Sequence, residues 1–493
     1  MAELAGIVLA AGLGTRMKSS LPKVMHTVAG RPMVWYMTSL ARRLTDSLVV
    51  VVVGHGGECV RAYLESERDT LTPFTTVVQS QQRGTGHAVR QARRVLMVNG
   101  TCRAKACLIL NGDTPLLTEQ TVRALIRHHR VKRAEVTVLT TILDRPSGYG
   151  RIVRDKKGHV LRIVEERDAT PEEREIREVN VGTYIVNGEF LFRALAALTP
   201  ANAQGELYLP DIIGIAVRQG RRVAAMATND PLECLGVNTR EQLACAEREF
   251  RRRIAARWME AGVTLRDPAT TYIDSDVHIG RDTILYPQVM LEGRTRIGEE
   301  CVIRSHTRIT DSIIGNRVAV QDSCVMNEAI IEDEVTIGPF AHLRPGSRLR
   351  VRSRVGNFVE LKHTELGEGT KANHLSYLGD AIVGREVNIG AGTITCNFDG
   401  FRKDRTVIDD HVFVGSDSQL VAPVTIGRGA LIAAGSTVTQ DVPADALCIS
   451  RAPQVIRPGA AARRRAARSR VAPSKSQEKP ERKSLRRSRR ATS

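Results

Sequence analysis

Short apolar runs alternate with amphipathic stretches through the first half of the chain. The runs are 6–10, 48–53, 106–110 and 136–141, and the stretches with helical spacing are 33–44 and 120–128. Runs of consecutive apolar residues are typical of strands that are buried on both faces of a sheet. The alternation over about residues 5–227 therefore predicts a Rossmann-like α/β domain with a mostly parallel sheet.

The second half has a different period, because apolar residues recur at every sixth position. One slip follows residue 309, and the repeat is interrupted over 396–407. The members are Ile273, Ile279, Leu285, Leu291, Ile297, Ile303, Ile309, Ile314, Val320, Met326, Val383, Ile389, Thr395, Ile408, Val414, Leu420, Ile426, Ile432 and Val438. A helix has a period of 3.6 and a flat strand a period of 2, whereas a parallel β-helix with three short sides needs one inward residue in six. The pattern resembles the hexapeptide left-handed β-helix, which commonly forms trimers.

These two patterns divide the 493 residues into four parts. We expect the α/β domain at 1–230, a helical linker rich in Glu, Arg and Ala at 231–262, the β-helix at 263–456 and a basic tail at 457–493. A chain of this length is too long for one core, and its 42% of hydrophobic residues can build more than one. The expected fold class is α/β plus β.

The formal charge of +18 comes mostly from the tail. From residue 457 onward, fourteen Lys and Arg side chains stand against two Glu. The tail has too few apolar side chains to offset chain entropy, so we expect it to be disordered. It is either simply solvated or in contact with RNA, anionic lipid or an acidic partner. It has no aromatic residue for base stacking, which argues against sequence-specific reading of nucleic acid.

Cysteine usage and hydropathy indicate the compartment. The nine cysteines include no Cys-x-x-Cys pair, and their odd number suits reduced thiols rather than a zinc site or a disulfide framework. The longest aliphatic run, 48–53, is far too short to span a membrane, and the N-terminus lacks the pattern of a signal peptide. We expect a soluble, cytoplasmic protein.

A glycine-bearing turn follows the first predicted strand at once. Gly12 and Gly14 allow the backbone to turn sharply and bring N–H groups near phosphate oxygens, and Arg16 and Lys23 add positive charge. Alone, such a turn is more often a simple strand-to-helix connection with two solvated cations. The dinucleotide-binding fingerprint is absent, since Met17 replaces its third glycine, and so is the Walker spacing.

Asp113 comes just after the predicted strand 106–110. Ligands of such sheets lie beyond the carboxyl ends of the strands, and magnesium prefers a few hard oxygen ligands together with the phosphates of a nucleotide. Asp113 is therefore a candidate magnesium ligand, although an Asp that merely turns a loop is an equally ordinary explanation.

Polar residues that break the six-residue repeat cluster in one region of the second half. Arg344 and Lys362 supply cations, and His374 and Tyr377 add an imidazole and a phenol that an apolar coil does not need. Histidine titrates near neutral pH and can take a proton from an amine that attacks a thioester. A lone histidine on such a coil usually has no role, but this cluster favours a second active site.

These motifs resemble those of the bacterial bifunctional N-acetylglucosamine-1-phosphate uridylyltransferases and glucosamine-1-phosphate N-acetyltransferases. Residues 9–23 resemble the Leu-x-x-Gly-x-Gly-Thr-Arg-Met and Pro-Lys signature of sugar-1-phosphate nucleotidylyltransferases. The acetyltransferase half is matched at 373–380, 395–400, 415–417 and 449–451. The resemblance covers about residues 4–453.

The resemblance implies two reactions in sequence. Acetyl-CoA would acetylate glucosamine-1-phosphate, and the product would attack UTP, in a magnesium-dependent step, to give UDP-N-acetylglucosamine and pyrophosphate. The nucleotide sugar would serve cell-wall synthesis, as a precursor of peptidoglycan and lipopolysaccharide.

The resemblance also implies roles for matching residues in the first domain. Arg16 and Lys23 would stabilise the charge of the transition state, and Asp113 and Asn238 would hold magnesium. UTP and the nucleotide sugar would contact Leu9, Ala10, Ala11, Gly12, Lys23, Gln79, Gln82, Gly84, Thr85, Gly150, Glu165, Asn180 and Asn238.

In the second domain the resemblance implies that His374 is the base. Glucosamine-1-phosphate would contact Arg344, Lys362, Tyr377 and Asn388. Acetyl-CoA would lie between subunits of a homotrimer, against Ala391, Asn397, Phe398, Lys403, Ser416, Ala434 and Arg451. Two positions depart from the family: Asn111 precedes Gly-Asp where some members have another side chain, and Phe398 replaces a frequent Tyr.

Two alternatives remain open. A nucleotidylyltransferase for another sugar, whose β-helix only trimerises or regulates, would keep Lys23 and Asp113 but would have no use for His374. A trimeric scaffold with a nucleic-acid-binding tail would have broken catalytic positions, and the sequence shows none.

Overall fold

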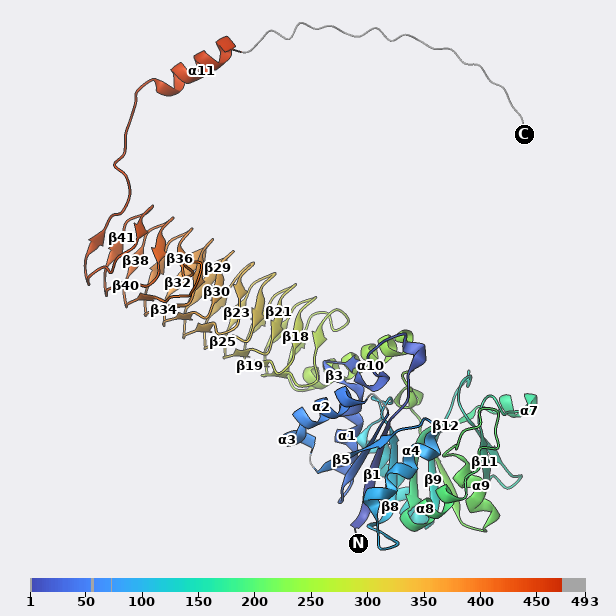
Figure 1. Ribbon diagram of the computed structural model, residues 1–493. Coiled ribbons are helices and arrows are strands. Elements are labelled where there is room, and N and C mark those ends of the chain that lie inside the picture. The colour runs from blue at the N-terminus through green and yellow to red at the C-terminus, as the bar shows by residue number, and fades with distance from the viewer. Residues whose placement is uncertain (1, 55–56, 72, 472–493) are drawn as a thin grey trace, which may run out of the picture.

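The computed structural model describes residues 2–54, 57–71 and 73–471. In Figure 1 an α/β domain at the N-terminal end is joined through helix α10 (Arg240–Glu260) to a long three-sided β-helix. The predicted order of the two architectures is confirmed.

One nine-stranded sheet forms the centre of the first domain. Its main path runs β11-β10-β12-β8-β1-β4-β5, and β9 pairs with both β12 and β13. The strands are β1 Ala2–Ala10, β4 Val49–Gly54, β5 Phe74–Gln79, β8 Ala104–Asn111, β9 Val136–Ile142, β10 Arg151–Arg154, β11 Val160–Val164, β12 Glu178–Asn187 and β13 Val223–Ala227. All four apolar runs form strands, as predicted.

The expectation of a mostly parallel sheet is wrong for its second half. Strands β8, β1, β4 and β5 are parallel neighbours, but β12 runs antiparallel to β8, β9 and β10. The hairpin β10–β11 is also antiparallel. A parallel pairing of β9 and β12 would need a crossover, usually a long helix, but the chain between them forms the hairpin β10–β11 and the four-residue helix α7 (Pro171–Arg174), and β12 returns antiparallel.

Helices cover both faces of this sheet, which explains the unbroken apolar runs. Ile7 and Val8 are adjacent in β1 and both fully buried, but they belong to two different cores. One core includes residues of α4 (Thr85–Gln91), α8 (Gly188–Ala196) and α9 (Asp211–Arg218), and the other residues of α1 (Met33–Leu44), α2 (Glu58–Ser66) and α6 (Glu119–Lys132).

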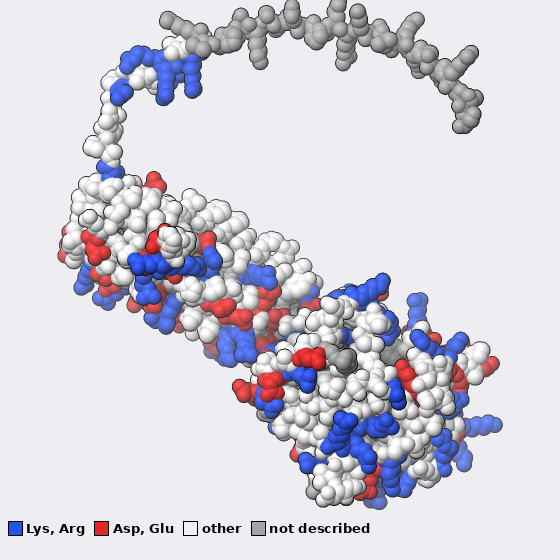
Figure 2. All heavy atoms as spheres, viewed as in Figure 1, with Lys and Arg blue, Asp and Glu red and all other residues white. Residues whose placement is uncertain are grey.

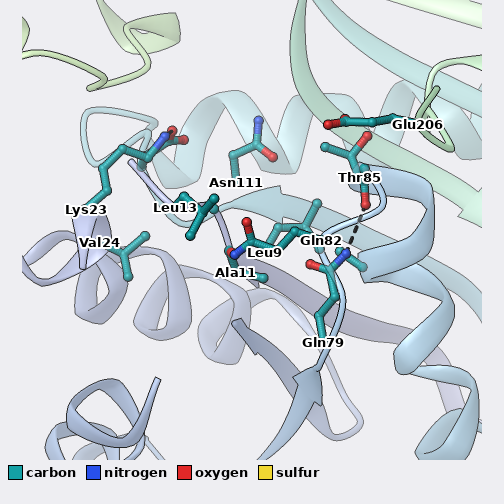
Figure 3. A pocket seen from close by; sticks show the side chains of 14 residues that line it. Leu9, Ala11, Leu13, Lys23, Val24, Gln79, Gln82, Thr85, Asn111 and Glu206 are labelled. Atoms are coloured by element: carbon teal, nitrogen blue, oxygen red, sulfur yellow. Dashed lines mark hydrogen bonds and ion pairs between the residues drawn. The ribbon is translucent and has the colours of Figure 1, made fainter. Parts of the chain in front are cut away.

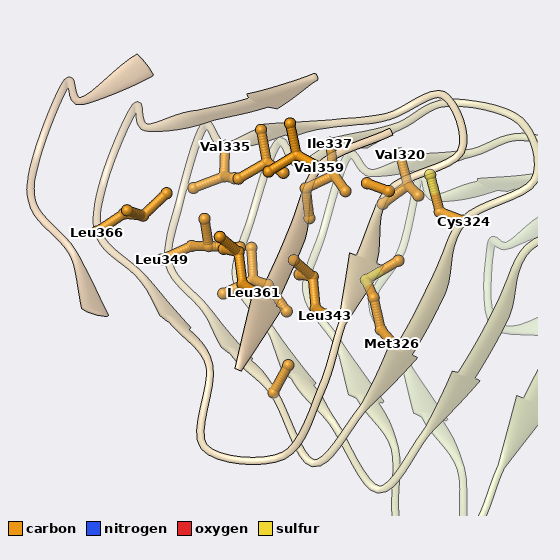
Figure 4. Packing of buried hydrophobic residues seen from close by; sticks show 14 of the residues in the cluster. Val320, Cys324, Met326, Val335, Ile337, Leu343, Leu349, Val359, Leu361 and Leu366 are labelled. Atoms are coloured by element: carbon orange, nitrogen blue, oxygen red, sulfur yellow. The ribbon is translucent and has the colours of Figure 1, made fainter. Parts of the chain in front are cut away.

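Three parallel sheets of eleven, ten and nine short strands form the β-helix. They run from β14 (Thr264–Leu265) to β43 (Leu447–Cys448), and each strand pairs with the strand of the next coil, as Ile273 does with Leu291. Every predicted inward position is buried, with at most 6% of its surface exposed. Figure 4 shows such side chains stacked inside the coils. The period of six is thus explained by one inward residue on each side.

The interruption of the repeat is a loop. It lies between β36 (Ile394–Cys396) and β37 (Thr406–Ile408), and an antiparallel bridge between Phe398 and Lys403 closes it. The loop leaves the coil without disturbing the stack, because Thr395 still pairs with Leu420 in the next coil.

Helix α10 and one ion-pair cluster join the domains. Ile254 and Ala255 of α10 pack on the apolar core of the β-helix, together with Ala29 of the first domain. Arg31 Nη1 lies 2.6 Å from Glu67 Oε1, and Arg31 Nε donates to Asp276 Oδ2 at 2.6 Å. The cluster therefore ties the α/β domain to the first coils.

Part of the basic tail forms a helix, which contradicts the expected disorder there. Helix α11 (Ala460–Val471) consists mostly of Ala and Arg, whose high helix propensity supports local hydrogen bonds without burial. Residues 472–493 lie outside the described residues, and contact of the tail with nucleic acid or an anionic surface stays a prediction. Among the helices of the described ranges, none is long and apolar enough to cross a membrane.

The alternation in β22 (Ile313–Ile314) gives a matched test of the core. Ile314 is 3% exposed and Ile313 is 51% exposed. We expect Ile314→Ala to lower the free energy of unfolding by about 2–5 kcal/mol, because it leaves a cavity between coils. Ile313→Ala should cost less than about 1 kcal/mol. Denaturant unfolding measures both, and equal losses would contradict the inward assignment.

Candidate active sites

A cavity of about 350 Å³ opens at the carboxyl ends of β1 and β5. Side chains from the first glycine loop, the end of β5 and the start of α4 surround it (Figure 3). The lining residues are Leu9, Ala11, Gly12, Leu13, Lys23, Val24, Gln79, Gln82, Gly84, Thr85, Ala88, Asn111, Asp113 and Glu206. The structure thus brings together most of the residues expected to contact UTP. Glu206 was not predicted, and no sequence motif marks it.

Two predicted residues of the first loop do not line this cavity. Ala10 is buried within β1, and Arg16 is exposed in the short helix η1 (Thr15–Met17) beyond it. The glycines differ as well. Gly14 has φ +63° and a Cβ there would stand 2.6 Å from Lys23 Cβ, whereas a Cβ on Gly12 would meet nothing within 4 Å. Gly14 therefore makes the tight turn, and Gly12 leaves the cavity wall open.

Two glutamines hold the second loop in place, and one of them bonds it to the first. Gln82 Nε2 donates to Ala11 O at 2.9 Å, and Gln79 Nε2 donates to Gly84 O at 3.1 Å. Gln79 Nε2 also lies 3.1 Å from His87 Nδ1. These contacts use the amide N–H groups, so the amide oxygens keep their capacity to accept hydrogen bonds.

Three segments distant in sequence meet at one cation. Lys23 Nζ forms an ion pair with Asp113 Oδ2 and donates to Asn238 Oδ1 at 3.0 Å. A carboxylate and an amide oxygen therefore converge on one positive charge, which is a donor pair that magnesium accepts when phosphates complete its coordination. Within the described part of the chain, no cluster of three or more His, Cys, Asp or Glu could hold a metal alone.

A second cavity of about 200 Å³ adjoins the first. Its lining includes Leu9, Thr85, Asn111 and Asp113, which line the first cavity too. Also in its lining are the predicted residues Gly150, Glu165, Asn180 and Asn238, and the residues Tyr149, Tyr184, Leu209 and Cys234 that the sequence analysis missed. Only Tyr149 had a sequence signal, since it stands between the two glycines of Gly-Tyr-Gly.

Asn111 lies close to the backbone of β12. Gly182 has φ +80°, and a Cβ there would stand 2.1 Å from Asn111 Nδ2, so only glycine fits this approach. The neighbouring Asn180 Oδ1 accepts from Gly182 N at 2.9 Å. The Asn111 side chain, which lines both cavities, fits there because residue 182 is a glycine.

Glu165 is a buried carboxyl in the second cavity. Burial raises its pKa to about 7, with smaller contributions from Asp211 and Asp168. Arg151 opposes this rise, but its guanidinium also pairs with Glu166 at 2.7 Å. Glu165 therefore changes protonation near neutral pH, and its neutral form can donate a hydrogen bond.

In the β-helix, His374 shares one corner with predicted acetyl-CoA residues. Asn357 and His374 are register partners, and the corner residues that follow are bonded from coil to coil. Gly392 N donates to Leu375 O, Asp417 N to Ala391 O and Gly435 N to Ser416 O, at 2.7–3.1 Å. The corner line is Asn357, His374, Ala391, Ser416 and Ala434, and the Arg451 guanidinium donates to Ala434 O.

The partner of His374 determines its tautomer. His374 Nδ1 lies 2.7 Å from Asn357 Oδ1. An amide oxygen only accepts, so Nδ1 carries the proton and Nε2 keeps a free lone pair. Asn357, which the sequence analysis missed, therefore orients the His374 ring.

Cationic side chains cluster on the side of the coil that follows the His374 corner, where Lys362 is in register with Gly379. Arg344 Nη1 lies 2.9 Å from Glu360 Oε1, and the half-buried Lys362 lies beside Lys403. The Lys403 ammonium, with Arg344 nearby, lowers the pKa of Lys362. Lys403, predicted for acetyl-CoA, thus joins the two predicted phosphate-binding cations in one cluster of positive charge.

Tyr377 and Asn397 lie near these cations. A Cβ on Gly379 would stand 2.5 Å from the Tyr377 hydroxyl and 2.9 Å from Asn397 Nδ2, and Asn397 donates to Asp380. Asn388 is on the adjacent sheet, in register with Lys371 and Phe413. Phe398 is 59% exposed, so its ring is available in the loop.

Comparisons with known proteins cover nearly the whole chain. A family model described as nucleotidyl transferase matches residues 5–262, and one described as bacterial transferase hexapeptide (six repeats) matches 405–440. The latter confirms the expected left-handed hexapeptide β-helix. Bifunctional protein GlmU of Trichlorobacter lovleyi is 50% identical over 459 residues, which are 93% of this chain and 98% of that protein. The GlmU proteins of Geotalea uraniireducens (93% and 99%) and Halalkalibacterium halodurans (92% and 97%) are also 50% identical.

Glu165 makes stability depend on pH in a defined direction. Its pKa is 4.5 when unfolded and about 7 when folded, so ionisation penalises the folded state increasingly from pH 4.5 to 7. We expect Glu165→Gln to be more stable than the wild type by about 3 kcal/mol at pH 8, and by little at pH 4.5. Denaturant unfolding at both pH values measures this, with the exposed Glu175→Gln as control. An unchanged difference between the two pH values would contradict it.

Proposed function

This chain belongs to the family of bifunctional GlmU proteins, and we propose that it makes UDP-N-acetylglucosamine in two steps. The protein is a transferase. In the first step the amine of glucosamine-1-phosphate attacks the thioester carbonyl of acetyl-CoA, and CoA leaves. In the second, a phosphate oxygen of N-acetylglucosamine-1-phosphate attacks the α-phosphorus of UTP, and pyrophosphate leaves.

The observation that best supports uridylyl transfer is the pair of adjoining cavities with a cation at their boundary. UTP fits the first cavity, between the two glycine loops, and the sugar phosphate fits the second. The reacting α-phosphorus would then lie near Asp113, which lines both. Proximity of the two reactants supplies much of the rate.

Asp113 and Asn238 would hold a magnesium ion, which when bound neutralises charge on the triphosphate. Lys23 occupies that point in this structure, so we propose that it moves to the α-phosphate as the nucleotide binds. Arg16 is exposed in η1, next to the first glycine loop, and its long side chain would reach the leaving pyrophosphate. Charge placed where it develops in the transition state lowers the barrier.

The remaining contacts divide between the two cavities. The Gln79 amide oxygen would accept from the single N–H of the uracil edge, a Gln82 N–H would donate to a uracil carbonyl, and Glu165 and Asn180 would hold sugar hydroxyls. We propose as further nucleotide contacts Leu9, Ala10, Ala11, Gly12, Gly84 and Thr85, with Gly150 beside the sugar.

For acetyl transfer, His374 Nε2 would take the proton from the attacking amine. Asn357 holds the ring in the tautomer that this role requires. Arg344 and Lys362 would bind the phosphate, with Tyr377 and Asn388 on the sugar. Acetyl-CoA would follow the corner line above His374, against Ala391, Asn397, Phe398, Lys403, Ser416, Ala434 and Arg451.

We propose a homotrimer that packs through the β-helix. Apolar side chains are exposed along its coils, and the rings of Phe340 and Phe358 stack with centroids 5.1 Å apart on the surface. Acetyl-CoA would lie at the junction between subunits. All nine cysteines are free, which suits the reducing cytoplasm where these substrates occur.

We also propose that the domain limits are those of the sequence analysis. Uridylyl transfer would belong to 1–230 and acetyl transfer to 263–456, with 231–262 as the linker. The contacts of α10 with both domains support a linker of fixed orientation.

A coupled assay on the full chain tests both reactions. With glucosamine-1-phosphate, acetyl-CoA, UTP and magnesium, we expect CoA thiol and pyrophosphate to be released, and pyrophosphate release to require acetyl-CoA. Removal of magnesium with a chelator should stop only pyrophosphate release. Pyrophosphate from N-acetylglucosamine-1-phosphate without any CoA release would leave a uridylyltransferase with a purely structural β-helix.

Substitutions should separate the two activities. We expect Asp113→Ala to lower uridylyl transfer by about 10²–10³-fold and to spare acetyl transfer, because it removes a charge at the reacting phosphate. His374→Ala should do the reverse, since it removes the base. Separate assays of CoA and pyrophosphate measure this, with Asp69→Ala and the corner residue His306→Ala as controls. If either substitution abolished both activities in a folded protein, the two sites would not be separate.

A further inference from the structure

A large cavity lies behind the proposed uracil site. Its volume is about 700 Å³, and it is bounded by α4, α5 (Arg93–Leu96), the turn after Met97 and helix α8. Its lining residues are Ser80, Gln81, His87, Arg90, Gln91, Arg93, Arg94, Met97, Gly100, Phe192 and Ala196. None of the residues described above as binding substrate lines it. We call it the basic cavity.

The basic cavity carries strong positive charge. Arg90, Arg93 and Arg94 line it, and its lining contains no Asp or Glu. Among the ion pairs of the described residues, none involves these three guanidiniums, whereas other arginines of the domain, such as Arg43, Arg123 and Arg154, pair with carboxylates. In Figure 2, blue side chains gather on the face of the first domain where Figure 1 places α4. Unpaired guanidiniums around a hollow attract phosphate groups.

His87 links this cavity to the active site. It is buried, and Nε2 lies 3.2 Å from Gln91 Nε2 while Nδ1 lies 3.1 Å from Gln79 Nε2. Gln79 lines the first active-site cavity. Helix α4 also faces both cavities, with Thr85 and Ala88 on one side and Arg90 on the other.

We propose that the basic cavity binds a phosphorylated metabolite, and that its occupation weakens UTP binding in the adjacent active site. The arginines would hold the phosphate groups, while Met97 and Phe192 would contact the organic part of the ligand. The effect on UTP rests on the proposed function, but the binding of the anion does not.

The coupling follows from the chemistry of the imidazole ring. Burial lowers the pKa of His87, and so does the charge of Arg90, against a hydrogen bond with the Gln81 backbone that raises it, and the net effect favours the neutral ring. A neutral Nδ1 can accept from Gln79 Nε2. A bound phosphate favours the imidazolium, in which both nitrogens carry protons and neither can accept. Gln79 then loses this contact and turns away from the position proposed to read uracil.

Charge reversal in the cavity tests binding. The probe is fructose 1,6-bisphosphate, with inorganic phosphate as the smaller comparison, titrated into the full chain by calorimetry. We expect R93E/R94E to lower the affinity for the bisphosphate by at least about tenfold. The control is R127E/R130E, which makes the same charge change at exposed positions of α6 and should change affinity less than twofold. Equal affinity in the two double variants would overturn the site, and both should melt as the wild type does.

The effect on UTP tests the coupling. Saturating bisphosphate should raise the KM for UTP by about fivefold or more in the wild type and in R127E/R130E, but not in R93E/R94E. H87N keeps an acceptor near the Nδ1 position but cannot titrate, so it should bind the probe without a shift in KM. A shift that persists in R93E/R94E would mean that the probe acts at the active site, which overturns the proposal. If no variant releases pyrophosphate, the proposed function fails, and calorimetry with UTP still measures the coupling.

Discussion

In-register stacking of parallel strands is the constraint on which both proposed sites depend. In the β-helix, each coil is bonded to the next at equivalent positions, so residues about one coil apart become neighbours. Asn357 lies against His374 for this reason, and Ala391, Ser416 and Ala434 continue the same line. The apolar interior that holds the stack leaves the corners free to carry polar groups. Substitution of a polar corner residue therefore changes the packing of the apolar core little.

Parallel pairing of strands also determines which loops meet at the edge of the α/β sheet. Parallel strands β1, β4, β5 and β8 deliver their following loops to one edge, where Lys23 and Asp113 meet. The third member of this group, Asn238, comes from the segment before α10. One electrostatic contact thus joins the sheet edge to the connection between domains, and a charged substrate that enters there must replace the contacts of Lys23.

The two domains are held in a defined relation by packing and charge. Helix α10 contributes Ile254 and Ala255 to the core of the β-helix, and Arg31 reaches Glu67 within its own domain and Asp276 in the coils. Gly30 belongs to this joint, because with φ +80° a Cβ would stand 2.4 Å from the Asp274 carboxyl. The two proposed sites consequently lie on separate domains that this joint connects.

Local pattern alone determined four strands of the first domain, the inward positions of the β-helix from Ile273 to Val438 and the order of the two architectures, because burial imposes a period that a sequence displays directly. The glycine loop and Asp113 were likewise predictable, since their chemistry is read from adjacent residues. Only the tertiary structure decided that β12 runs antiparallel, that Asn357 orients His374, that Lys403 lies beside Lys362 and that His87 connects two cavities. Each of these depends on contacts between residues distant in the chain or on the direction of a connection, and neither leaves a local periodic signal.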